Sequence, residues 1–279
     1  MDVADIKLAV RQHIAAATKA LHHPDLDDEA VHGARKDLKR ARSGLRLLRP
    51  LDEAAYRREN ARLRDAGRWL SGVRDDKVLL GMLEGLLEKE KKPERRRLIE
   101  RLMARLEKER QRDWRAVRAA KRRRELREAL GESAQRVEAW RAPHEGAAVP
   151  TAALRRLYRK GRKALERSRK EPSDEQLHEA RKQAKHLRHV VEILAEGKPS
   201  KRARKVIKRA NAVGDFLGED HDLAVVESRF EHLSSAPARP KHKLERRIEK
   251  RRARLQKKAL KKARKLYSVP PKRILQAAA

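Results

Sequence analysis

The chain carries the same histidine-led set of cations twice. The first stripe is His32, Arg35, Lys36, Lys39 and Arg42, and the second stripe is His178, Arg181, Lys182, Lys185 and Arg188. One offset of 146 residues (178 − 32) relates the two stripes. In each, the cations follow the histidine by three, four, seven and ten residues, which places all five side chains on one face of a helix. Like charges on one face repel unless an anion neutralises them, so each stripe is interpreted as a surface for a dense anion.

The overall composition points to the same class of partner. The chain has 279 residues and a formal net charge of +34, from 75 Lys and Arg against 41 Asp and Glu. Such an excess favours nucleic acid, an anionic membrane or a polyphosphate, although a generally basic, solvated surface is the plainer alternative. Aromatic residues are only 3% of the chain. This scarcity argues against stacking of single-stranded bases.

The sequence does not predict an enzyme, a metal site or a cofactor. The absence of cysteine excludes thiol catalysis and cysteine-ligated metals, and no nucleophile elbow, glycine-rich phosphate loop or His-Glu-x-x-His motif is present. Neighbouring cations oppose a divalent ion at His178, His186 and His189. The acids at 75–76 and 219–222 are interpreted as helix N-caps or partners of stripe arginines rather than a two-metal centre.

The elements that must position the stripes are all predicted to be helices. Apolar spacing, caps and Pro or Gly breaks predict helices over about 3–21, from 27 or 28 to Pro50, over 52–70, after Asp75-Asp76, over 93–130, from Thr151 to Pro172, over 175–195, up to about 217, from 221 onward and from 240 to about 267. No stretch reaches the roughly 20 apolar residues of a membrane span. The N-terminus lacks the pattern of a secretory signal, so a cytoplasmic location is expected.

The repeat extends beyond the stripes. At the same offset, Leu48 matches Leu194, Arg58 matches Arg204, Ala66 matches Ala212, Gly72 matches Gly218, and Asp76 matches Asp222. These matches predict two helical halves, 1–142 and 143–279, with the boundary inside the Gly- and Pro-containing segment 131–150. Two similar halves would pack about a pseudo-two-fold axis. That packing would bring the stripe helices together and create a positive cleft.

The stripe motifs resemble a known family. VHGARKDLKRAR at 31–42 and LHEARKQAKHLRHVVE at 177–192 are similar to the CHAD family, the conserved-histidine α-helical domain, as are LRRLYRKGRKAL at 154–165 and LGEDHDLAVV at 217–226. The resemblance implies an all-α fold of two pseudo-symmetric four-helix bundles around a basic central cavity. It also implies binding of inorganic polyphosphate there without catalysis. The residues then expected to bind phosphate are both stripes together with Arg155, Arg159, Arg162, Arg58, Arg204 and Lys208.

A nucleoid-type DNA-binding protein is the alternative function, because any strongly basic surface binds DNA at low salt. No helix-turn-helix, zinc-finger or RNA-recognition pattern supports it. Basic amphipathic helices could also touch anionic lipid. Association with polyphosphate granules is a further hypothesis that follows from the polyphosphate interpretation.

Overall fold

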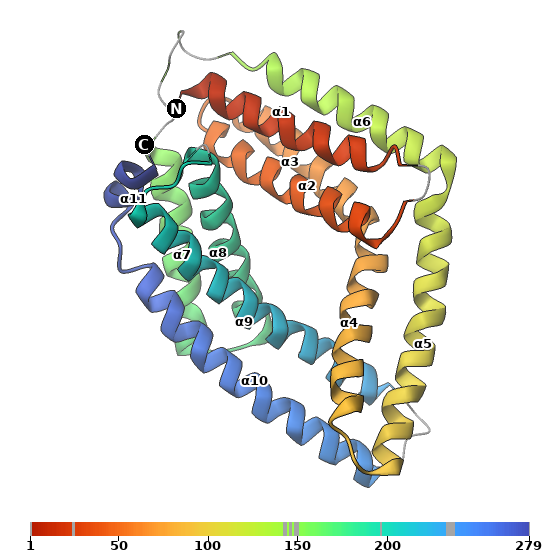
Figure 1. Cartoon of the computed structure of the whole chain (residues 1–279). Helices are drawn as coiled ribbons and strands as arrows, with labels where there is room; N and C mark the ends of the chain where they lie inside the picture. Colours follow the sequence, from red (N-terminus) through yellow and green to blue (C-terminus); the bar gives the residue numbers. More distant parts are fainter. Residues whose placement is uncertain are drawn as a thin grey trace.

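The computed structural model describes residues 2–23, 26–141, 144, 147, 151–195, 197–232 and 238–278. Within these ranges the chain forms helices and no strand. The helices are α1 (Val3–Ala20), α2 (Asp28–Leu48), α3 (Glu53–Trp69), α4 (Ser71–Glu88), α5 (Pro93–Arg118), α6 (Ala120–Glu138), α7 (Thr151–Lys170), α8 (Asp174–Leu194), α9 (Lys201–Glu231), α10 (Ala238–Leu266) and α11 (Pro271–Ala278). The all-α prediction is confirmed (Figure 1).

The two stripe helices, α2 and α8, form for the same local reasons. The side chain of Asp27 caps α2 by accepting from the backbone N–H of Ala30, and Ser173 caps α8 by accepting from Gln176. These caps satisfy donors that a helix N-terminus leaves unpaired. The buried apolar residues also repeat at the 146-residue offset: Val31, Ala34, Leu38, Ala41 and Leu45 in α2, and Leu177, Ala180, Ala184, Leu187 and Val191 in α8.

Helix α2 packs directly against α8, as the sequence predicts for the stripe helices. At their crossing, Ser43 Oγ lies 3.4 Å from Nδ1 of His189, its own counterpart at the repeat offset. A contact between a residue and its counterpart is the pattern that a two-fold axis produces. The full two-bundle arrangement and the division between residues 142 and 143 stay predictions.

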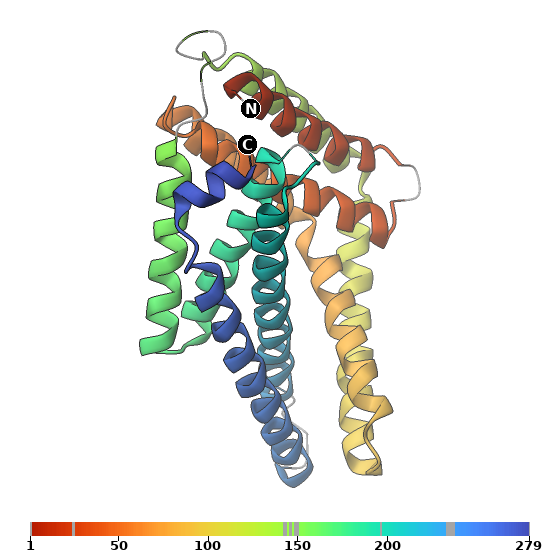
Figure 2. The same ribbon diagram turned by 60° about the vertical axis from the view of Figure 1, so that its left-hand side comes forward.

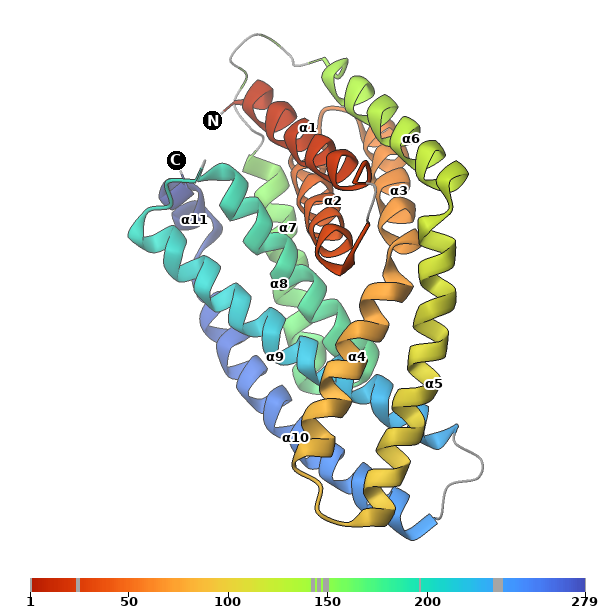
Figure 3. The same ribbon diagram turned by 45° about the vertical axis from the view of Figure 1, so that its right-hand side comes forward.

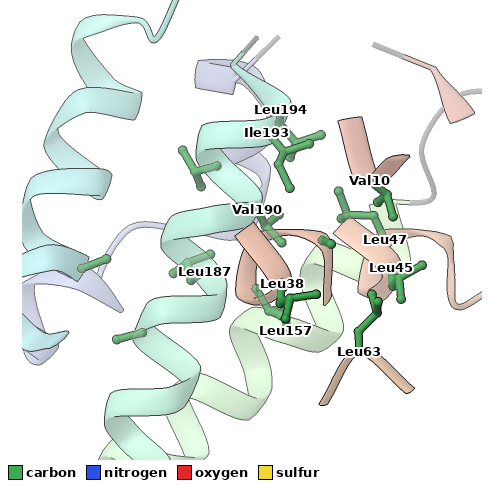
Figure 4. Packing of buried hydrophobic residues seen from close by; sticks show 14 of the residues in the cluster. Val10, Leu38, Leu45, Leu47, Leu63, Leu157, Leu187, Val190, Ile193 and Leu194 are labelled. Carbon is green, nitrogen blue, oxygen red and sulfur yellow. The ribbon is translucent and has the colours of Figure 1, made fainter. Parts of the chain in front are cut away.

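The hydrophobic interior forms two clusters. The larger one joins residues of α1, α2, α3, α6, α7, α8 and the first part of α9, and so crosses the predicted boundary between the halves. Figure 4 shows part of it, with Leu38 and Leu45 of α2 among Leu157, Leu187 and Val190. The smaller cluster joins α4 and α5 to the distal ends of α9 and α10. Figures 2 and 3 show the α4–α5 and α9–α10 pairs extending away from the larger cluster.

Four predicted helix boundaries are wrong. Helix α9 runs unbroken through Gly218 and Asp222, and α4 already begins at Ser71, so Asp75 and Asp76 lie inside a helix rather than at its N-cap. The predicted helix 93–130 is divided at Ala119 into α5 and α6. Neither part projects as a free arm, because α5 packs on α4 and α6 packs on α1. Helix α6 also continues past Gly131, where the sequence predicts the linker to start.

Candidate functional site

The crossing of α2 and α8 brings cations of both stripes together. Burial lowers the pKa of Lys185 to about 7, and the next causes are the charges of Arg181 and of Lys39 from the other stripe. Burial likewise lowers the pKa of Lys39 to about 8, with Arg35 and Arg181 as the next causes. Each stripe therefore lies within electrostatic range of the other, and the free protein bears the repulsion between them.

Lys39 is in an environment that protein surrounds but solvent still reaches. Its side chain is exposed, yet desolvation is the largest cause of its lowered pKa. Two surface hollows of the described chain lie elsewhere. One, of about 390 Å³, is lined by Arg101, Ala104, Arg105, Lys108, Glu109 and Arg112. The other, of about 250 Å³, is lined by Arg202, Lys205, Val206, Arg209, Val269 and Arg273. Neither contains a stripe residue, so the central cavity stays a prediction.

The inner arginines of the stripes are held by neighbouring helices. Arg35 donates to the carbonyl of Gly67 at 3.0 Å and pairs with Asp75 at 3.3 Å. From the sequence, the acids could act as helix caps or as arginine partners, and for Asp75 the structure supports the second interpretation. Arg181 instead lies against α9, where a Cβ at Gly218 would come within 3.2 Å of its guanidinium. Gly218 therefore provides space for an arginine and does not end a helix.

Lys185 also packs against a glycine of α9, one turn before Gly218. A Cβ at Gly214 would lie 3.2 Å from Cε of Lys185, so the lysine stem packs along a glycine surface. These small residues let α8 and α9 approach closely while the ammonium group stays beside Arg181 and Lys39.

The last arginine of each stripe is held by an asparagine. Arg42 donates to Oδ1 of Asn60 at 3.1 Å, and Arg188 donates to Oδ1 of Asn211 at 2.6 Å. The arginines are 146 residues apart (188 − 42), but the asparagines are 151 apart (211 − 60). The repeat offset therefore does not carry over to the contacts of α3 and α9. One reason is the preceding connection, which has four residues before α3 (49–52) and six before α9 (195–200).

Because the offset changes, Arg58 and its sequence counterpart Arg204 lie on different faces of their helices relative to Asn60 and Asn211. Arg58 is two residues from Asn60, which is about 160° around the helix and hence on the far side of α3. Arg204 and Lys208 are seven and three residues before Asn211 (211 − 204 and 211 − 208), which places both on its face of α9. Arg204 and Lys208 therefore share the face of Asn211 and Arg58 does not share the face of Asn60, while phosphate binding by all three stays a prediction.

The stripe histidines are held in their neutral form. Desolvation and the charge of Arg74 lower the pKa of His32, whose Nδ1 accepts from Nε of Arg74 at 3.1 Å. Desolvation and His221 lower the pKa of His178, and the two imidazole rings lie 5.3 Å apart. Both rings are therefore available to take up a proton when an anion arrives.

The α7 arginines are not drawn into the stripes. Arg155 and Arg159 are exposed, and Arg162 pairs with Glu166 at 3.1 Å. Within the described chain, no hydrogen bond or ion pair joins the three to a stripe residue, so their role stays a prediction. Lys160 of the same helix instead lies in range of Arg46 and Arg49, which lower its pKa after burial does.

The sequence analysis missed these neighbours of the stripes, although part of the signal was present. Arg46 and Arg49 follow His32 by 14 and 17 residues, steps that continue the same helical face. Arg64 and Arg68 of α3, which lower the pKa of Arg42, gave no signal, because a sequence does not show which face of α3 meets α2.

The remaining histidines of α8 are packed inside the crossing. Nδ1 of His186 lies 3.2 Å from Ser43 Oγ, and burial is the first cause that lowers the pKa of His189 to about 3. Across the described ranges, no group of three or more His, Asp or Glu side chains is placed to hold a metal ion. None of the helices described is long and apolar enough to cross a membrane.

The fold and the site together define an all-helical protein in which two cation stripes meet at one helix crossing. The CHAD domain model matches residues 6–231, and the chain belongs to this family. Its structure is similar to the crystal structure of the CHAD domain from the plant Ricinus communis, with a TM-score of 0.65, 19% identity, and coverage of 97% of this chain and 94% of that one. It is also similar to PptA from Streptomyces chartreusis, with a TM-score of 0.65, 14% identity and 99% coverage of both chains. No curated protein matches the chain in sequence.

Proposed function

We propose that the chain binds inorganic polyphosphate through its two stripes without hydrolysing it. The observation that carries this proposal is the convergence of Lys39, Arg181 and Lys185 from two helices on one place. Such a place offers a chain of closely spaced negative charges several contacts at once. Membership of the CHAD domain family, which is associated with polyphosphate binding, gives independent support.

Several features favour polyphosphate over DNA as the partner. The cations converge where two packed helices cross, so they suit a single thin chain of phosphates better than two separated strands. The two asparagines beside the stripes, Asn60 and Asn211, accept from stripe arginines and are not free to read bases. The CHAD domain is generally a binding domain, and the non-catalytic role and a cytoplasmic place on polyphosphate granules follow as parts of the proposal.

The test compares two variants that lose the same charge. In the first, Lys36, Lys39, Lys182 and Lys185 become Gln. In the control, Arg254, Lys257, Lys261 and Lys262 of α10 become Gln; these are exposed and have no ion-pair partner within the described chain. Titration with long-chain polyphosphate should show at least a roughly hundredfold loss for the stripe variant and less than about fivefold for the control, since screened distant charges contribute little. Equal losses would mean diffuse electrostatic binding and would refute a site.

A competition experiment separates the two candidate functions. Polyphosphate should displace duplex DNA from the wild-type protein at moderate salt, whereas DNA should displace polyphosphate poorly. Both affinities should fall with salt, because each neutralised phosphate releases counterions. If DNA wins at physiological ionic strength, the nucleoid-type alternative replaces the polyphosphate proposal. Release of orthophosphate during the incubation, with or without magnesium, would contradict the non-catalytic part.

A further inference from the structure

The two stripes end differently. One turn beyond Arg42 in α2 stands Arg46, whereas its counterpart in α8 (46 + 146) is Glu192. Glu192 pairs with Arg188 at 3.2 Å and with Arg40 of α2 at 3.9 Å, so a carboxylate closes the second stripe. Arg46 donates to the carbonyl of Arg42 and has no ion-pair partner among the described residues. Glu179 lies in electrostatic range of Arg46 but pairs with Lys182, so the first stripe continues as a cation where the second one ends in a carboxylate.

Helix α7 meets this open end of the first stripe. It contacts both α2 and α8, and its Leu157 lies in the same core cluster as the apolar residues of α2 (Figure 4). Lys160 follows Leu157 by three residues and is exposed. After burial, the charges of Arg49, Arg156 and Arg46 lower the pKa of Lys160. Arg46, Arg49, Lys160 and Arg156 are therefore neighbours and form one run of cations. Two acids lie beside the run: Glu53 pairs with Arg49, and Glu179 is in electrostatic range of Arg46 and Lys160.

The second stripe ends among acids where the first one continues as cations. Glu192 pairs with Arg188 and with Arg40 of α2, and Arg40 also lies 3.7 Å from Asp37. Asp37 in turn pairs with His13 of α1 at 3.0 Å. The run of cations therefore continues past the first stripe and not past the second.

We propose that this run is a one-sided extension of the polyanion site, formed by Arg46, Arg49, Lys160 and Arg156, and that it makes the protein prefer long polyphosphate chains to short ones. The inference rests on the proposed function. A short chain satisfies the stripes and ends at Arg42. A longer chain leaves the crossing past Arg46 and gains further contacts along α7, while Glu192 repels a chain that tries to leave along α8.

The test compares two exposed pairs of cations with the same spacing. In the extension variant Arg156 and Lys160 become Gln, and in the control Lys257 and Lys261 of α10 become Gln; all four side chains are exposed. Tripolyphosphate and long-chain polyphosphate are titrated into the wild-type protein and both variants. The extension variant should bind the long chain roughly tenfold more weakly, with a salt slope smaller by about 1.4, if each lost contact contributes roughly 0.7 as it does for single strands. Its affinity for tripolyphosphate should stay unchanged, and the control should match the wild-type protein for both ligands.

Three results would overturn the extension while leaving the stripes intact. These are an unchanged long-chain affinity, an equal loss for both ligands, or an equal loss in the control. Circular dichroism of each variant checks that the helices are retained. If the wild-type protein binds neither ligand, the proposed function itself fails, and the extension fails with it.

Discussion

Raising the pH should deprotonate the two lysines at the stripe crossing, Lys39 and Lys185, and weaken polyphosphate binding. The pKa of Lys185 is about 7 and that of Lys39 about 8 in the free protein, against an ordinary value of 10.5. A bound polyanion favours the charged form of both ammonium groups and raises these pKa values. Binding therefore takes up protons wherever the free lysines are partly neutral, and affinity must fall as pH rises through that range.

The size of the effect follows from the two pKa values. At about pH 8, Lys185 is roughly one-tenth charged and Lys39 roughly half charged, so recharging both takes up about 1.4 protons. Between about pH 6 and about pH 8, the affinity should fall by a factor of about 10 through Lys185 and about 2 through Lys39. The product is a loss of roughly twentyfold.

Calorimetry in two buffers with different ionisation enthalpies measures the proton uptake directly. The double variant Lys39→Arg with Lys185→Arg keeps both charges at every pH used, because arginine does not deprotonate in this range. Its affinity should vary much less between about pH 6 and about pH 8. His32 and His178 add proton uptake only at the acidic end, since their pKa values are lowered. Zero proton uptake at about pH 8, or an unchanged pH profile in the arginine variant, would refute this reasoning.

Two further predictions concern stability. Burial and neighbouring carboxylates raise the pKa of Asp76 from 3.8 to about 6. Ionising this side chain therefore destabilises the folded state, and the protein loses stability as the pH rises through that interval. In urea unfolding, Asp76→Asn should therefore raise the free energy of unfolding by up to about 3 kcal/mol above about pH 6 and leave it unchanged below about pH 4. The control Asp65→Asn, which removes a carboxylate that pairs with an arginine, should not stabilise the protein. An Asp76→Asn variant less stable than the wild type at about pH 7 would contradict this prediction. Gly161→Ala places a Cβ against the Tyr267 hydroxyl and should cost about 1–3 kcal/mol in thermal unfolding. Gly81→Ala, whose Cβ would have no neighbour within 4 Å, should gain about 0.5–1 kcal/mol. Equal effects of the two substitutions would refute the role of packing at Gly161.

The sequence was sufficient for the features that local rules determine. The caps at Asp27 and Ser173, and the apolar positions of α2 and α8, follow from short-range chemistry that repeats at one offset. The meeting of the two stripes was also predictable, because similar halves pack about an axis that relates each residue to its counterpart. The contact of Ser43 with His189 has this pattern.

Other contacts between residues that are distant in the sequence were not predictable. Gly218 resembles a helix terminator in the sequence, but in α9 it leaves room for Arg181. A glycine that ends a helix and one that admits a neighbour give the same local signal. The break between α5 and α6 at Ala119 has no glycine or proline to mark it. The face of α3 on which Arg58 lies depends on the connection between α2 and α3. A repeat of residue types in the sequence does not show how that connection is built.

The electrostatics of the crossing connect the fold to the proposed binding. Apolar packing of α2 on α8 surrounds Lys39 and Lys185 with protein and brings both near Arg181. Burial first, and the neighbouring charges second, lower the pKa values of both lysines. Among the described residues, three acids relieve part of this repulsion: Asp75 reaches Arg35, Asp215 lies in range of Lys185, and Asp222, whose pKa burial raises, lies in range of Arg181. A core that holds cations together in this way leaves part of their neutralisation to an outside anion. A bound polyanion that supplies it must stabilise the fold, by an amount that grows with the logarithm of its concentration relative to its Kd.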